Sequence, residues 1–116
     1  MMNTYRRLLE VLEPLPAMSR RVHKKDFSVK QPAWEVLYGG RRRNRNGWSD
    51  MWTVVVWGGP DHVPNAQEVL MLSTQRVTDA LLEVDGVEFT EAAVDVQIPG
   101  LAELPFTRAT IDVYEV

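Results

Sequence analysis

The sequence predicts a single α+β domain, with a mainly antiparallel sheet of about four strands and two helices packed on one face. Two segments repeat apolar residues at the three-and-four spacing of a helix, and four others have the patterns of strands. The 116 residues are 45% hydrophobic and contain no internal repeat, which suits one core and excludes several domains. Residues 1–116 are therefore expected to form one domain.

The first helix is predicted from Asn3 to Glu13. Asn3 or Thr4 would be its N-cap, and Pro14 would end it. Its apolar residues share one face of the helix: Tyr5, Leu8, Leu9 and Leu12.

A basic segment, residues 18–31, follows the helix and has few apolar anchors. Edge strands often contain lysine, which blocks unwanted pairing, and basic arms reach across to neighbouring subunits or phosphates. The segment is thus either an edge strand or an arm. Its candidate contact residues are Arg20, Arg21, Lys24, Lys25 and Phe27.

Two strands and a long basic loop come next. Ala33 to Tyr38 alternates between apolar and polar faces, whereas Met51 to Trp57 is apolar on both faces and predicts a central strand. Residues 39–50 between them are expected to form a long hairpin loop. This loop contains four arginines and a tryptophan: Arg41, Arg42, Arg43, Arg45 and Trp48.

The second helix is predicted from Ala66 to Val84, after a strand break at residues 58–61, with Asn65 as its N-cap. One stripe of the helix faces the sheet and consists of Ala66, Leu70, Ser73, Val77, Ala80, Leu81 and Val84. On the other side, Met71, Thr78 and Leu82 form a narrower apolar stripe, where a monomer would show polar side chains. This second stripe indicates a second partner.

Two closing strands are predicted at residues 94–98 and 110–116. Because two helices cover only one face of such a sheet, the other face must be polar or buried by another molecule. Four tryptophans are more than one small core comfortably holds, and tryptophan favours interfaces.

No motif for catalysis or cofactor binding is present, so we expect neither an enzyme nor a cofactor. There is no cysteine, and the two histidines, His23 and His62, do not have the spacing of metal ligands, so no metal site is predicted. No apolar run is long enough to cross a membrane, and the N-terminus lacks a signal-peptide core. The protein is therefore expected in the cytoplasm.

Charge divides the chain into two unlike halves. Residues 1–60 contain eleven Lys and Arg against five Asp and Glu, while residues 61–116 contain two against eleven. Basic and acidic surfaces of this kind can meet between copies. The arginine-rich loop could thus contact an acidic neighbour, bind nucleic acid through its phosphates, or simply be solvated.

The order of these elements resembles the small tail terminator proteins of long-tailed bacteriophages and related tail-completion and head-tail joining proteins. The similarity rests on a short first helix, a strand pair around a long loop, the turn Trp57-Gly58-Gly59-Pro60-Asp61, one long helix, and two final strands ending with Ala109-Thr110-Ile111-Asp112-Val113. It covers most of the chain and is a pattern of organisation.

The resemblance implies a structural virion protein without catalytic residues. Such a protein forms a homo-oligomeric ring, typically of six copies, at the head-proximal end of the tail. There it ends tail-tube growth and joins the tail to the head connector. The implied partners are other copies, the tail tube protein, the head-side connector and DNA that could pass through the ring; a membrane is not among them. Candidate subunit-interface residues are Arg41, Arg42, Arg43, Arg45, Trp48, Met71 and Leu82. The alternative is a small nucleic-acid-binding protein that uses the Arg41–Arg45 loop.

Overall fold

The computed structural model describes residues 3–20, 32–45, 47–60, 66–90, 93–97 and 106–115. Two helices and six strands lie in these ranges, in nearly the order that the sequence predicts. They are α1 (Asn3–Leu12), β1 (Ser19–Arg20), β2 (Ala33–Asn44), β3 (Gly47–Pro60), α2 (Ala66–Leu81), β4 (Val87–Phe89), β5 (Ala93–Gln97) and β6 (Phe106–Glu115).

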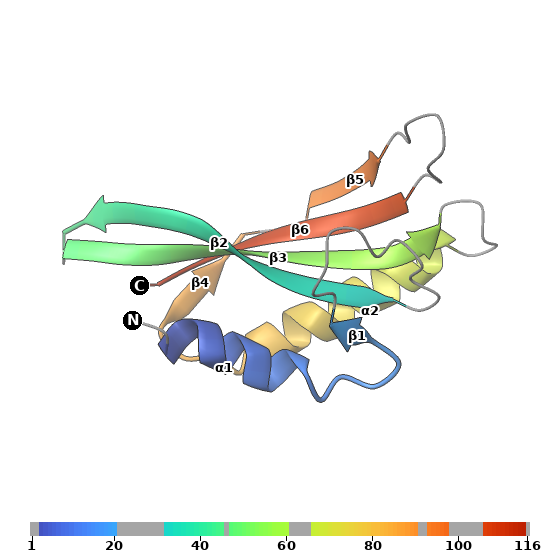
Figure 1. The fold of residues 1–116 in the computed structure, drawn as a ribbon, viewed down its shortest axis with the longest axis horizontal. Helices are drawn as coiled ribbons and strands as arrows, with labels where there is room; N and C mark the ends of the chain where they lie inside the picture. Colours follow the sequence, from blue (N-terminus) through green and yellow to red (C-terminus); the bar gives the residue numbers. More distant parts are fainter. Residues whose placement is uncertain are drawn as a thin grey trace.

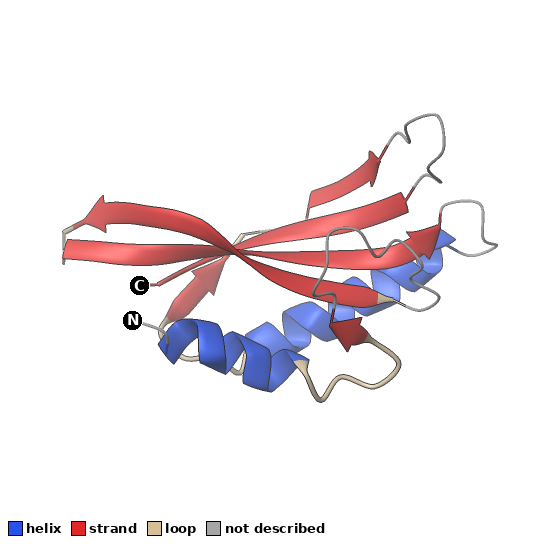
Figure 2. Ribbon diagram, viewed as in Figure 1, coloured by secondary structure: helices blue, strands red, loops and turns tan. Residues whose placement is uncertain are grey.

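The strands form one sheet in the order β1-β2-β3-β6-β4, and β5 also pairs with β6. Every pair is antiparallel except β1 with β2. Both helices lie on the same side of the sheet (Figures 1 and 2). The predicted α+β class is confirmed, and the four expected strands are present. The short strand β1 lies within the segment predicted as an edge strand or an arm, and the short strand β4 is additional.

The main core lies between the helices and the inner face of the sheet. On the central strand β3, Trp52, Val54 and Val56 alternate into this core, as a strand with one face against helices requires. Ile111 and Val113 continue the layer on β6 and are fully buried. The two helices complete the core with Leu8, Leu12, Leu70, Val77, Ala80, Leu81 and Val84.

The sheet-facing stripe of α2 is confirmed, since Leu70, Ser73, Val77, Ala80, Leu81 and Val84 are all buried. The helix itself ends at Leu81, three residues earlier than predicted. Neither α1 nor α2 is long and apolar enough to cross a membrane.

The strand break predicted at residues 58–61 is wrong at its start, because β3 continues to Pro60. The two glycines sit instead at an irregularity, where the pairing of β3 with β6 shifts register between Trp57 and Gly59. A Cβ at Gly58 would lie 2.8 Å from the Cβ of Leu70 and 3.1 Å from its Cα. Gly58 therefore lets the backbone of α2 approach the sheet closely.

The outer face of the sheet, opposite the helices, is not uniform. A second buried cluster of Ala33, Val55 and Trp57 lies on it, whereas Asp112 is exposed. Four tryptophans were expected to be too many for the core, but three of the four are buried. Only one is left exposed for an interface. That residue is Trp48, which is 63% exposed.

The basic segment 39–50 is a hairpin, as predicted, but it is not a long loop. β2 extends to Asn44 and β3 begins at Gly47, and the two strands are paired from Arg41 with Asp50 onward to the turn. The register shifts between Tyr38 and Gly40, and Gly40 has a φ of 103°, a conformation that favours glycine. The outer part of this hairpin extends past the end of the helical layer (Figure 1).

The remaining predictions concern the caps of the two helices and the basic segment 18–31. Thr4 is not the N-cap of α1, because it is inside the helix and buried. Of residues 18–31, predicted as an edge strand or an arm, Ser19 and Arg20 form β1 at the border of the sheet. Outside the described residues lie the proposed cap Asn65 and four of the arm residues, Arg21, Lys24, Lys25 and Phe27.

Candidate assembly surfaces

The first candidate surface is the outer hairpin, residues 41–50. Its arginines Arg41, Arg42, Arg43 and Arg45 are all exposed. Two of them lie over aromatic rings, with the Arg41 Cζ 5.3 Å from the ring centre of Trp48 and the Arg42 Cζ 4.4 Å from that of Tyr114. Cation–π contact thus holds the Arg41 guanidinium against Trp48 of the hairpin and the Arg42 guanidinium against Tyr114 of β6.

At the base of this hairpin, Tyr38 and Arg41 meet the carboxylate of Asp50. The Tyr38 hydroxyl donates a hydrogen bond of 2.9 Å to Asp50 Oδ1, and the Arg41 Nε lies 3.6 Å from the same oxygen. Desolvation, followed by this hydrogen bond, raises the pKa of Tyr38 above its ordinary value of 10.0. The Tyr38 hydroxyl therefore stays protonated and donates to Asp50. This bond ties the first residue pair of the hairpin, Arg41 with Asp50, to β2.

Glu115, at the end of β6, connects the hairpin to α1. Its Oε1 accepts a hydrogen bond of 2.9 Å from the backbone N–H of Asp50, and its Oε2 accepts one from the Thr4 hydroxyl. Asp50 directly precedes Met51, where the pairing of β3 with β6 begins. One carboxylate therefore anchors the hairpin at the point where β3 stops pairing with β6.

The second candidate surface is the outer face of α2. Met71 is 53% exposed and Leu82 is 69% exposed, in agreement with the predicted second stripe. Met71 and Leu82 thus form an exposed apolar strip. Leu72 is also 44% exposed, but it lies beside this strip, about 100° from Met71 on the helical wheel and beyond Glu68 and Asp79. Glu68, Asp79, Glu83 and Asp85 are exposed around the strip.

Exposed large hydrophobic residues gather on these two surfaces. In the described part of the chain, each such residue lies either on the β2–β3 hairpin and its stem or on α2: Leu37, Tyr38, Trp48, Met71, Leu72 and Leu82. Single exposed apolar residues are ordinary on a protein surface, but several of them on one element make it a candidate contact site.

Arg20, the one predicted arm residue in the described ranges, is engaged within the chain. Its Nη2 donates a hydrogen bond of 2.9 Å to the Tyr5 hydroxyl, and its Nη1 lies 3.7 Å from Glu13 Oε1. Its Cζ is also 5.9 Å from the ring centre of Trp34. These contacts give Arg20 a role in joining β1 to α1, which the sequence pattern did not indicate.

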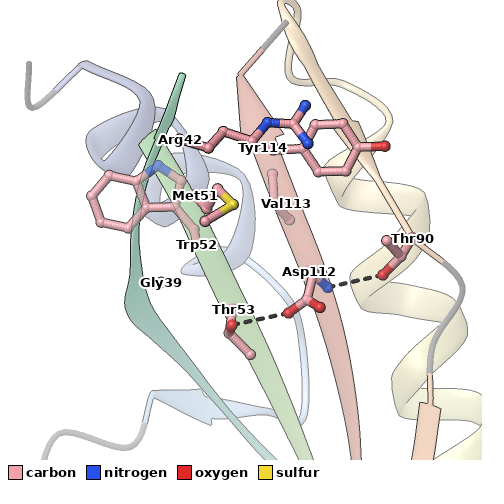
Figure 3. Close-up of a pocket in the computed structure, with 9 residues that line it drawn as sticks. All are labelled: Gly39, Arg42, Met51, Trp52, Thr53, Thr90, Asp112, Val113 and Tyr114. Carbon is pink, nitrogen blue, oxygen red and sulfur yellow. Dashed lines mark hydrogen bonds between the residues drawn. The ribbon is translucent and has the colours of Figure 1, made fainter. Parts of the chain in front are cut away.

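A pocket of about 300 Å³ lies on the sheet beside the base of the hairpin (Figure 3). Arg42 and Tyr114 border one side of it, and Thr90 and Asp112 the other. Its polar groups bind one another: the Thr53 hydroxyl donates to Asp112 Oδ1 at 3.0 Å, and the Asp112 N–H donates to Thr90 Oγ1 at 3.2 Å. The pocket thus joins β3, β6 and the residue after β4.

Within the described ranges, no three His, Asp or Glu side chains are grouped closely enough to hold a metal ion. The sequence reasoning missed Glu115 and Thr4, because 111 positions separate the two partners and no local pattern connects them. It also missed the exposure of Leu72, which the helical wheel places apart from Met71 and Leu82.

Comparison with known proteins adds no relationship. No model of a protein family matches the chain, and no curated protein matches its sequence.

Proposed function

We propose that the protein is a structural subunit that assembles into a homo-oligomeric ring and acts as a phage tail terminator or head-tail joining protein. In this role the ring caps the tail tube at its head-proximal end and presents a surface to the head-side connector. It needs no catalytic residue or cofactor.

The observation that supports this proposal is the presence of two unlike exposed surfaces on one small domain. The outer hairpin contains four exposed arginines and Trp48, and the outer face of α2 contains Met71, Leu72 and Leu82 among acidic residues. An assembly that repeats one heterologous contact closes into a ring when the rotation between copies closes. The order of elements, which resembles the tail terminators, supports the same role.

The first test is the mass of the purified protein by light scattering at low and high salt, with negative-stain imaging of large species. A ring of identical copies is expected, and its dissociation at high salt would implicate the opposite charges of the two halves of the chain. Binding of the protein to the open ends of phage tail tubes tests the terminator role directly. A monomer that binds neither its own copies nor tube ends contradicts the proposal.

The variant Met71→Asp/Leu82→Lys isolates the contribution of α2 to assembly. Because both side chains are exposed, we expect an unchanged thermal midpoint and no ring. A matched control places the same two residue types at exposed polar positions of α1, as Arg6→Asp/Glu10→Lys, and should assemble. Unfolding of the first variant would show that these residues belong to the core.

A second candidate function is nucleic-acid binding by the outer hairpin. Arg41 and Arg42 lie against aromatic rings, and Trp48 is exposed for stacking on a base. A gel shift of a labelled duplex that weakens steeply with salt would support it. The overall net charge of −3 favours the assembly role, because DNA-binding domains are usually basic throughout.

A further inference from the structure

We infer that the two candidate surfaces are the two sides of one contact: the outer hairpin of one copy docks on the outer face of α2 of the next copy. This inference rests on the proposed ring, and it names the segment that covers α2. Residues 41–50 of a second copy of this chain thus cover the apolar strip of Met71 and Leu82.

Charge complementarity is the first argument. The hairpin has four arginines and one aspartate in residues 39–50, a net charge of +3. α2 and the turn after it, residues 66–86, have four acidic residues and one arginine, a net charge of −3. That arginine, Arg76, donates a hydrogen bond of 3.3 Å to the carbonyl of Pro16, which directs it toward its own chain. Opposite charges of equal size steer the two surfaces together and disfavour contacts of each surface with itself.

The shapes agree as well. Met51 is the first residue of β3 that pairs with β6, and from there the hairpin continues outward for four residue pairs to Asn44 and Gly47. At about 3.3 Å per residue these pairs span about 13 Å before the turn. From Met71 to Leu82 is eleven positions, or about 17 Å along a helix axis. The hairpin with its turn therefore has the length of the strip, and Trp48 is an aromatic anchor of the kind that dominates interfaces.

The contact has to form between copies. The hairpin projects from one end of the sheet, away from the helical layer, while α2 lies beneath the sheet (Figure 1). Glu115 and Asp50 hold the base of the hairpin in this direction. Because the hairpin points away from its own α2, the two surfaces can meet only when they belong to different copies.

Mixing two variants that cannot assemble alone tests this pairing. The hairpin variant Arg43→Glu/Trp48→Ala keeps its α2 surface, and the helix variant Met71→Asp/Leu82→Lys keeps its hairpin. Each alone should be monomeric, and an equimolar mixture should double the mass to a heterodimer, because one intact pair of surfaces remains. If the mass does not increase on mixing, the inferred pairing of hairpin and α2 is wrong. The wild-type protein in the same buffer is the control: if it still forms a ring, the proposed function stands although the inferred contact does not.

Disulfide trapping gives a second readout. It detects the contact even where the two copies bind too weakly to stay associated in light scattering. The chain has no cysteine, so Arg45→Cys in one copy and Gln75→Cys in another are the only thiols, and diamide serves as the oxidant that accepts their two electrons. Both positions are exposed. Cross-linked heterodimer should exceed either homodimer, whereas Glu10→Cys on α1 should not replace Gln75→Cys. Equal cross-linking from Glu10 and Gln75 would refute the assignment of α2.

Discussion

Glu115 offers the most direct test of how the hairpin is positioned. The carboxylate accepts one hydrogen bond from the Thr4 hydroxyl and one from the Asp50 N–H, and it is half-buried. A hydrogen bond to a charged group contributes about 1.5–3 kcal/mol to stability. Because water partly reaches Glu115, each of its two bonds is expected to contribute near the lower value. Glu115→Ala should therefore reduce the free energy of unfolding by about 2–3 kcal/mol.

A double-mutant cycle separates the two bonds. Thr4→Val removes one donor at nearly constant volume and should cost about 1 kcal/mol, since the residue is buried. Urea denaturation of the two single variants and the double variant should give a coupling of about 1 kcal/mol between Thr4 and Glu115. Amide hydrogen exchange at Asp50 should accelerate in Glu115→Ala but not in Thr4→Val. A coupling below about 0.3 kcal/mol, the scatter of additive sites, would refute the role of Glu115 as a shared acceptor.

Three further predictions concern the core and the hairpin base. Gly58→Ala should cost about 1–3 kcal/mol in urea denaturation, because its Cβ would press on the backbone of Leu70, and an unchanged midpoint would contradict that close approach. Val54→Ala, at a fully buried site on the central strand, should cost about 2–3 kcal/mol by the same assay, and a loss below about 1 kcal/mol would contradict its place in the core. Tyr38 should ionise above its ordinary pKa of 10.0 in an ultraviolet titration of wild type against Tyr38→Phe, and Asp50→Asn should bring this pKa down. Because the pKa is raised by folding, the stability linked to Tyr38 is complete below pH 10 and is lost as pH rises through the folded-state pKa, a loss that Tyr38→Phe should abolish.

The helices and main strands were predictable because their signals are local. Apolar spacing located α1 and α2, and the run Met51 to Trp57 identified the central strand. The same patterns separated the buried stripe of α2 from exposed Met71 and Leu82, because a helical wheel reports both faces at once.

The features that the sequence did not predict depend on partners distant in the chain. Polar residues 41–50 have the composition of a loop, but pairing between β2 and β3 keeps them extended, as tertiary context often overrides propensity. Gly58 and Gly59 suggested a turn. In the structure, glycine is needed at position 58 because Leu70 of α2 lies too close for a Cβ. Three tryptophans that composition assigned to interfaces are buried because two cores, one on each face of the sheet, accommodate them.

These differences also bear on how a ring could be held together. A flexible basic loop would lose conformational entropy on docking, whereas a paired hairpin anchored through Asp50 and Glu115 has already lost most of it. In the proposed ring, the direction in which the hairpin leaves the sheet would set the rotation from one copy to the next. Since closure of a ring depends on that rotation, loosening Glu115 should broaden the distribution of assembly sizes even where Trp48 and α2 remain intact. Negative-stain images of Glu115→Ala would then show open or irregular assemblies, and uniform rings would indicate that the hairpin direction is set elsewhere.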